Sequence, residues 1–162
     1  MAIDKVRAYL KQFNREQDII EMDTSTATVT TAANALGVIP ARIAKSISLR
    51  KDDAAMLVVA SGDMKLDNSK FKTRFGFKAR MLSAEEVVQF TGHAPGGVCP
   101  FALPGNVEVY LDISLQRFQT IFPACGSANS LIELTPEELS AYSKNVEWVD
   151  VCKTLPAPGS AP

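Results

Sequence analysis

The feature that most constrains the fold is a pair of β-prone runs that follow one another closely. The first run, "AKSISLRK", covers residues 44–51, and the second, "AAMLVVAS", covers residues 54–61. Two such runs joined by a few residues are typical of a β-hairpin. Because the second run is apolar almost throughout, it indicates a strand that is covered on both faces. We therefore expect this hairpin to form the centre of a sheet.

Helices and further strands are indicated around the hairpin. Near the N-terminus, apolar residues recur at helical spacing: Ile3, Val6, Leu10 and Phe13. Capping signals and periodicity predict further helices over 28–37, 83–92, 114–122 and 135–144. Further strands are predicted over 18–22, 107–112, 130–135 and 146–152. Because the two types do not alternate strictly, the expected fold is α+β, with a mixed, mostly antiparallel, barrel-like sheet and surrounding helices.

Length and composition indicate one domain. The chain has 162 residues, of which 46% are hydrophobic, enough for a single core but short for two. We expect that domain to cover residues 1–153 and to be followed by a flexible, proline-rich tail, residues 154–162. No apolar run approaches the roughly 20 residues that a membrane span needs, which predicts a cytoplasmic protein without a membrane partner. The three cysteines lack C-x-x-C spacing and are expected to be reduced thiols.

The net charge of −1 argues against binding of nucleic acid by bulk electrostatics, although a local basic face remains possible. One stretch is basic, and phenylalanines are interleaved with its cations: Lys65, Lys70, Lys72, Arg74, Lys78 and Arg80. We favour a solvated helix whose aromatic side packs on the core, since most charge runs face solvent. An RNA-contacting face is the alternative.

A second constraint is the loop "TGHAPGGVCPFALP", residues 91–104, which holds three glycines, three prolines and the only histidine of the chain. His93 and Cys99 are too few ligands for a zinc site, and no nucleotide-binding glycine motif is present, so neither a metal nor a cofactor is expected. A hydrolase with Cys99 as nucleophile and His93 as base stays open. A second interpretation is recognition by backbone amides, because Gly96 and Gly97 would let a ligand approach the main chain. A third is a tight turn with a structural role alone.

In this loop and in two other segments, the chain resembles the YbaK-type aminoacyl-tRNA deacylase family, which is related to the editing insertion of bacterial prolyl-tRNA synthetases. The likeness is carried by three segments in order: "STATVTTAANALGVIPARIAKSISLR", "TGHAPGGVCPFALP" and "VYLDISLQRFQTIFPACGSANSLIELTPEEL". Residues Gly96 to Pro100 match the G-x-x-x-P loop of the family, and Lys45 falls where the family carries its pocket lysine. Independently, a lysine next to a buried strand needs an anionic or carbonyl partner, although a surface lysine would also fit the sequence.

The resemblance implies hydrolysis of the ester that joins an amino acid to the 3′ acceptor end of tRNA, with the attacking water organised partly by the ribose hydroxyl of the substrate. It assigns catalysis to Lys45, Gly96 and Gly97, with the loop amides on the ester carbonyl and the lysine on the terminal nucleotide. It assigns substrate binding to Val98, Cys99, Pro100, His93, Asp112, Ser127 and Asn129. For Asp112, a role as a strand-end cap is an equal alternative, and for Ser127 and Asn129 a role in a turn.

Two departures from the family bear on specificity. Cys99 stands where many relatives have serine, and Ala102 where they have glycine. These changes would resize the aminoacyl pocket, and they leave the edited amino acid open among alanyl, cysteinyl, seryl and threonyl esters. Two other functions stay open: a non-catalytic module that binds a tRNA end or an aminoacyl-tRNA synthetase, and the Cys99-dependent hydrolase.

Overall fold

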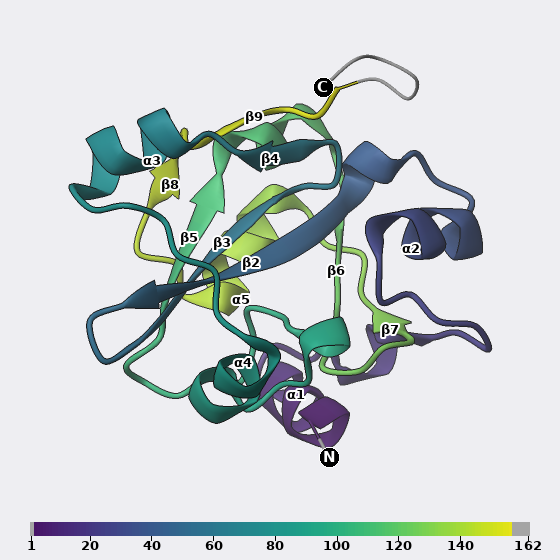
Figure 1. Ribbon diagram of the computed structural model, residues 1–162. Helices are drawn as coiled ribbons and strands as arrows, with labels where there is room; N and C mark the ends of the chain where they lie inside the picture. Colours follow the sequence, from purple (N-terminus) through teal and green to yellow (C-terminus); the bar gives the residue numbers. More distant parts are fainter. Residues whose placement is uncertain (1, 157–162) are drawn as a thin grey trace.

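A five-stranded sheet is at the centre of the molecule (Figure 1). In this computed structural model, which describes residues 2–156, the strands are ordered β6, β2, β3, β5, β8. Their bounds are Phe122–Pro123, Ile43–Lys51, Ala54–Ser61, Glu108–Asp112 and Trp148–Val149, in that order. β2 and β3 pair antiparallel along their whole length, from Ala44 opposite Ser61 to Lys51 opposite Ala54. The predicted central hairpin is confirmed.

Segments that are distant in the sequence complete the sheet. β6 pairs with β2, β5 with β3, and β8 with β5, all in parallel. Two short antiparallel pairs lie beside it, β1 (Ile20–Glu21) with β7 (Ser130–Leu131) and β4 (Met64–Leu66) with β9 (Cys152–Thr154). An isolated bridge from Ala124 to Leu131 links the β6 edge to β7. The expected α+β fold with a mixed sheet is confirmed, and antiparallel pairing accounts for most of the paired residues.

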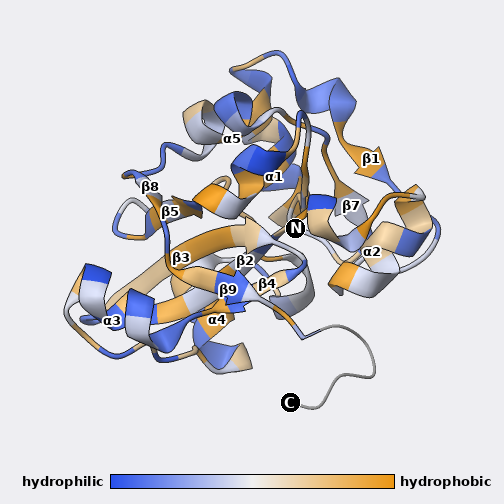
Figure 2. Ribbon diagram, turned by 90° about the horizontal axis from the view of Figure 1, so that it is seen from above, coloured by the Kyte–Doolittle hydropathy of each residue, from blue (hydrophilic) through white to orange (hydrophobic). Residues whose placement is uncertain are grey.

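The alternation of side chains along β3 explains why this strand is apolar on both faces. Leu57 belongs to one buried cluster and Met56 to the other, and both are fully buried. The first cluster is covered by α1 (Ala2–Lys11) and α5 (Pro136–Ser143), and the second by α3 (Asn68–Phe75). Figure 2 shows β3 as a largely hydrophobic ribbon between helices of mixed character. Helices on both sides therefore bury the central strand.

The capping signals of the sequence are confirmed at three helix starts. Thr28 caps α2 (Val29–Leu36), Ser83 caps α4 (Ala84–Thr91) and Thr135 caps α5, each within a capping box. In each box the hydroxyl accepts from the backbone amide three residues later, and the side chain of that residue accepts from the cap. These local hydrogen bonds explain why the helix starts could be predicted accurately.

The predicted helix over 114–122 was wrong. A short 3-10 helix, η4 (Ile113–Arg117), is present, after which the chain becomes extended. Ile121 then bridges to Leu134, and Phe122 enters β6. The apolar spacing of this segment suits a helix, but pairing with strands far away in the sequence prevails over local periodicity.

The other predicted strands are shorter than expected. Of residues 18–22 and 130–135, only the two residues of β1 and of β7 form strands. The predicted strand over 146–152 is divided between β8 and β9, which belong to different sheets. The division has a physical cause, because the amide of Val151 donates to the buried carboxylate of Asp112 at 3.0 Å instead of to a neighbouring strand.

The basic stretch folds as the favoured interpretation predicts. Phe71 of α3 is fully buried and packs at an angle against the rings of Phe75 and Phe77 in the second cluster. On the outer side, Lys70 pairs with Asp150 at 3.1 Å, and Arg74 pairs with Glu147. The aromatic side of this segment therefore packs on the core, while the cations face outward.

Three further expectations concern the ends and the thiols. Thr154 is the last residue of β9, and residues 157–162 of the expected tail lie outside the described residues. Among the helices of residues 2–156, none is long and apolar enough to cross a membrane. Cys99, Cys125 and Cys152 are buried and free.

Candidate functional site

A small pocket of about 100 Å³ brings together several of the residues that the sequence singled out. It lies where β2, the segment before α2 and the loop after α4 meet. Lys45, Gly96 and Val98 all line it. The other lining residues are Thr26, Ala27, Thr28, Val29, Ile43, Ala44, Ser46, Pro95, Ala124 and Leu131. The pocket thus brings Lys45 and the glycine loop together within a wall of mixed polar and apolar character.

Lys45 is held at this position by the central hairpin. It lies on β2 opposite Ala60, on the sheet face of the second buried cluster. Its ammonium group donates a hydrogen bond to the backbone carbonyl of Met64. Burial lowers the pKa of Lys45, and the nearby Cys152 and Asp63 offset this only in part. The protein therefore keeps a partly desolvated cation whose acceptor is a neutral carbonyl.

The polar residues on the wall of the pocket were not predicted from the sequence. Ser46, next to the lysine, has a buried hydroxyl without a hydrogen-bond partner among the described residues. Thr26 is buried, and its backbone amide donates to the carbonyl of Ala128 at 2.6 Å. The sequence signalled Thr28 as a helix cap, which is correct, but the start of α2 also forms one side of the pocket.

The two adjacent glycines of the loop have different surroundings. The loop folds as a 3-10 turn, η3 (Pro95–Gly97), in which the amide of Gly97 donates to the carbonyl of Ala94 at 2.8 Å. A Cβ atom on Gly96 would lie 3.2 Å from the Cβ of Ala27, across the pocket. A Cβ atom on Gly97 would lie only 2.7 Å from the amide nitrogen of Ser127. Gly96 therefore borders the pocket, while Gly97 is packed against a neighbouring turn.

Cys99 and His93 lie close together, but behind the pocket wall. The sulfur of Cys99 is 3.5 Å from Nε2 of His93, and both residues are buried. The same nitrogen lies 2.9 Å from the carbonyl oxygen of Phe101, so it carries the proton and donates it to that oxygen. It therefore cannot accept the thiol proton. Burial also raises the pKa of Cys99 to about 12 and lowers that of His93, so the geometry argues against a thiolate nucleophile.

The remaining predicted site residues do not line the pocket. Asp112 is buried and accepts from the amides of Ser114 and Val151, both at 3.0 Å. Asn129 donates to the carbonyl of Met22 at 2.9 Å. Pro100 is buried within the loop itself, and the hydroxyl of Ser127 donates to the side-chain oxygen of Asn129 at 2.9 Å. These contacts correspond to the alternative roles of cap and turn.

Within residues 2–156, no group of three or more histidine, cysteine, aspartate or glutamate side chains is placed to hold a metal ion.

The chain is similar to known proteins over most of its length. Residues 23–142, which include Lys45 and the loop, match the model of the aminoacyl-tRNA editing domain. The chain is 58% identical over 154 residues to the uncharacterized protein YwhH of Bacillus subtilis, covering 94% of this chain and 98% of that protein. It is 27% identical over 128 residues to proline–tRNA ligase of Bacillus licheniformis, covering 78% of this chain and 22% of the ligase.

Among solved structures, the chain is similar to the crystal structure of "a putative trans-editing enzyme for prolyl tRNA synthetase". The TM-score is 0.84 with 29% sequence identity, and the likeness covers 94% of this chain and 97% of the other. The family model alone matches well over half of the chain. The chain therefore belongs to the aminoacyl-tRNA editing domain family.

Proposed function

We propose that the protein is a trans-acting aminoacyl-tRNA deacylase, which cleaves the ester bond of mischarged aminoacyl-tRNA and releases the amino acid and free tRNA. The observation that carries this proposal is the pocket itself. It brings Lys45, whose ammonium group is partly desolvated, together with Gly96 and Val98 around a space of about 100 Å³. In this proposal residues 1–153 act as one editing domain.

The reaction needs no nucleophilic side chain. Water attacks the ester carbonyl carbon, the bond from that carbon to the ribose oxygen breaks, and the ribose oxygen leaves as a hydroxyl group. We assign the amides of Gly96 and Val98 to the carbonyl oxygen, on which negative charge develops. The Gly97 amide is already used within η3, so this glycine supports the loop. The neighbouring ribose hydroxyl of the substrate helps to orient the water.

Lys45 supplies the electrostatic part of the mechanism. Its ammonium group exchanges the carbonyl of Met64 for a phosphate or ribose oxygen of the terminal nucleotide. A charged acceptor is a stronger partner than a neutral carbonyl, and partial burial increases the difference. The lysine would therefore bind the tRNA end and hold the ester beside the loop.

The small volume indicates a small aminoacyl side chain. Size alone separates neighbouring small side chains by only about 1–3 kcal/mol per methylene, so several esters can be substrates. The partner is the 3′ end of an aminoacyl-tRNA, which implies a cytoplasmic location. Because related sequence is found within proline–tRNA ligase, an aminoacyl-tRNA synthetase is a further candidate partner.

The decisive experiment is a deacylation panel with purified protein and tRNAs that are each charged with one amino acid. We expect hydrolysis of esters with small side chains and none of those with large ones. A protein that binds charged tRNA but hydrolyses none of the panel would instead be a binding module. A Lys45→Ala variant measured in parallel separates this activity from a contaminating hydrolase.

A further inference from the structure

A second pocket, of about 290 Å³, lies beside the first and has no role in the function proposed so far. It is formed by the β4–β9 pair and η4, and its residues include Met64, Ile113, Arg117 and Asp150. Lys45 connects the two pockets. It lines the first, and its ammonium group donates to the carbonyl of Met64, which lines the second. A ligand group that takes the ammonium of Lys45 from the Met64 carbonyl would therefore lie next to this second pocket.

The charges of the second pocket are paired within it or at its rim. Arg117 forms two hydrogen bonds to Asp63, at 2.6 and 3.1 Å, and Lys70 lies 3.1 Å from Asp150. At the base of the pocket the Asp112 carboxylate is already occupied by two backbone amides. A site with balanced charges is poorly suited to a highly charged anion. It suits a neutral group that has hydrogen-bonding edges.

Its walls favour a flat ligand. Ile113 is an aliphatic side chain that is 43% exposed, and Met64 provides a second apolar wall. The Asp150 carboxylate remains open to solvent, with 58% of its side chain exposed, and can accept further hydrogen bonds. Arg117 adds a planar guanidinium group, which stacks well on aromatic rings. Apolar faces, a carboxylate acceptor and a planar cation are the features that bind an amino-substituted nucleobase.

We infer that this second pocket receives the adenine base of the terminal nucleotide, whose ribose carries the ester. The inference rests on the proposed function, because it takes its ligand from it. The ester lies in the first pocket, Lys45 contacts the ribose or phosphate, and the base packs against Ile113. The exocyclic amine of adenine donates to the carboxylate of Asp150.

The first test compares adenosine with inosine as inhibitors of deacylation and as ligands in NMR titrations. The two nucleosides have the same size, but inosine has a carbonyl where adenosine has the amine. We expect adenosine to bind at least about tenfold more tightly, since one correct base contact gives this order of discrimination. Asp150→Asn should remove the preference, because an amide can donate to the inosine carbonyl. Glu147→Gln, which breaks the neighbouring ion pair with Arg74, is the matched control and should keep the preference.

The second test blocks the pocket. Ile113→Glu should raise KM for charged tRNA about tenfold or more while kcat changes less than about threefold, because a base contact is lost and the ester site is untouched. Val88→Glu is the control, since Val88 is 51% exposed on α4, away from this pocket. Both variants should melt close to the wild type.

The outcomes distinguish this inference from the function on which it rests. If charged tRNA is hydrolysed but adenosine and inosine bind equally, or Ile113→Glu behaves like Val88→Glu, the adenine site is refuted and the deacylase stands. If Ile113→Glu impairs hydrolysis of charged tRNA but not of 3′-aminoacyl-adenosine, the pocket holds another nucleotide, and the inference is wrong. If no charged tRNA is hydrolysed, the proposed function fails, and the NMR titration alone decides whether the pocket binds adenosine.

Discussion

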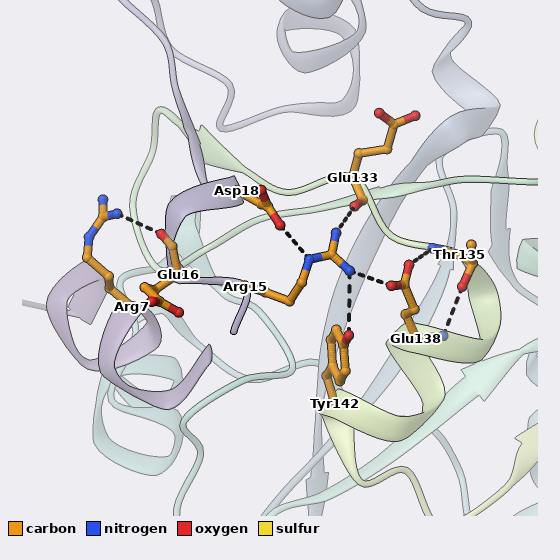
Figure 3. A network of polar contacts seen from close by, with 8 residues as sticks. All are labelled: Arg7, Arg15, Glu16, Asp18, Glu133, Thr135, Glu138 and Tyr142. Carbon is orange, nitrogen blue, oxygen red and sulfur yellow. Dashed lines mark hydrogen bonds and ion pairs between the residues drawn. The ribbon is translucent and has the colours of Figure 1, made fainter. Parts of the chain in front are cut away.

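Two partly buried cations of this protein, Arg15 and Lys45, have opposite surroundings. Arg15 donates to the carboxylates of Asp18 and Glu138, to the carbonyl of Glu133 and to the hydroxyl of Tyr142 (Figure 3). Burial works to lower the pKa of Arg15, but these partners outweigh it and raise the pKa. Lys45 donates to a neutral carbonyl, and burial lowers its pKa.

The difference teaches how to separate structural from functional charges. The Arg15 network joins the turn after α1 to α5, so its partners belong to the fold, and the pairing is complete before any ligand arrives. At Lys45 the ammonium is partly desolvated, its hydrogen-bond partner is a neutral carbonyl, and the nearby Asp63 offsets the desolvation only in part. This is typical of a site that is prepared for a ligand. The same contrast predicts which substitutions should affect stability and which should affect turnover.

The largest effect is expected for Lys45→Ala. Loss of a charged hydrogen bond in a partly dry pocket corresponds to about 2–4 kcal/mol of transition-state stabilisation, or about two to three orders of magnitude in rate. The melting temperature should stay level or rise, because the free protein is relieved of a desolvated charge. Single-turnover deacylation and melting curves, recorded on the same samples, check both statements.

Lys45→Arg is the matched control for charge. It keeps the cation but should restore little activity, because a planar guanidinium group cannot replace a compact ammonium in a fitted pocket. A Lys45→Ala protein that melts much lower, while its folded fraction works at the wild-type rate, would make Lys45 a structural residue. The distinction between Arg15 as a structural cation and Lys45 as a functional one would then be wrong.

Arg15→Ala should have the reverse profile. It leaves Glu138 and neighbouring acceptors without their cation, which we expect to destabilise the fold by about 2–3 kcal/mol and lower Tm by about 4–12 °C. The network lies outside both pockets, so single-turnover deacylation below the melting range should remain within about twofold of wild type. A large loss of rate without loss of stability would contradict the division between the two cations.

Gly96 and Gly97 allow the same distinction between a functional and a structural residue to be tested on the backbone. Gly97→Ala forces a Cβ against the backbone of Ser127 at 2.7 Å and should cost about 1–3 kcal/mol of folding free energy. Gly96→Ala meets the Ala27 methyl group at 3.2 Å, so it should cost less stability but reduce turnover more, because the added methyl group borders the pocket. Chemical denaturation and single-turnover rates of both variants test this crossed pattern. Equal effects of the two substitutions would count against it.

Signals that are local in the sequence predicted much of the fold. The hairpin and the three helix caps, Thr28, Ser83 and Thr135, were predicted correctly because their hydrogen bonds join residues close together in the chain. The helix over 114–122 was mispredicted because the bridge between Ile121 and Leu134 depends on the folded arrangement. Similarly, the division of the strand over 146–152 depends on the Asp112 carboxylate, which no periodicity reveals.

For the candidate site, the sequence identified the segments better than the individual roles. Lys45 and Gly96, to which the resemblance assigns catalysis, line the same pocket, whereas Gly97, assigned the same role, does not line it. Sequence alone could not separate Gly96 from Gly97, because what distinguishes them is how close the turn at Ser127 comes. Ser46 was missed for a related reason, since the lack of a hydrogen-bond partner is a property of the folded structure and leaves no trace in composition.

A smaller effect is expected on the stability of the protein at acidic pH, where His93 takes up a proton. Burial lowers its pKa below 6.5, so the folded protein holds the neutral ring while the unfolded chain takes up a proton. The stability that depends on the neutral ring is therefore present above pH 6.5 and is lost as the pH falls through the folded pKa. His93→Gln, which can still donate to Phe101, should show a shallower loss of Tm on acidification. Parallel slopes for both proteins would refute this.

The smallest effect on the rate of deacylation is expected for Cys99→Ser. Although the thiol lies 3.5 Å from His93, it is fully buried, and its pKa is raised to about 12, so little thiolate forms near neutral pH. The hydroxyl of serine can donate to the carbonyl of Phe101 in place of the thiol, which lies 3.8 Å from it. Deacylation by the variant should therefore stay within about threefold of wild type, and thiol alkylating reagents should inhibit the native protein slowly. A loss of about a thousandfold, together with rapid inactivation by alkylation, would instead identify Cys99 as a covalent nucleophile and place the catalytic group on the buried side of the loop.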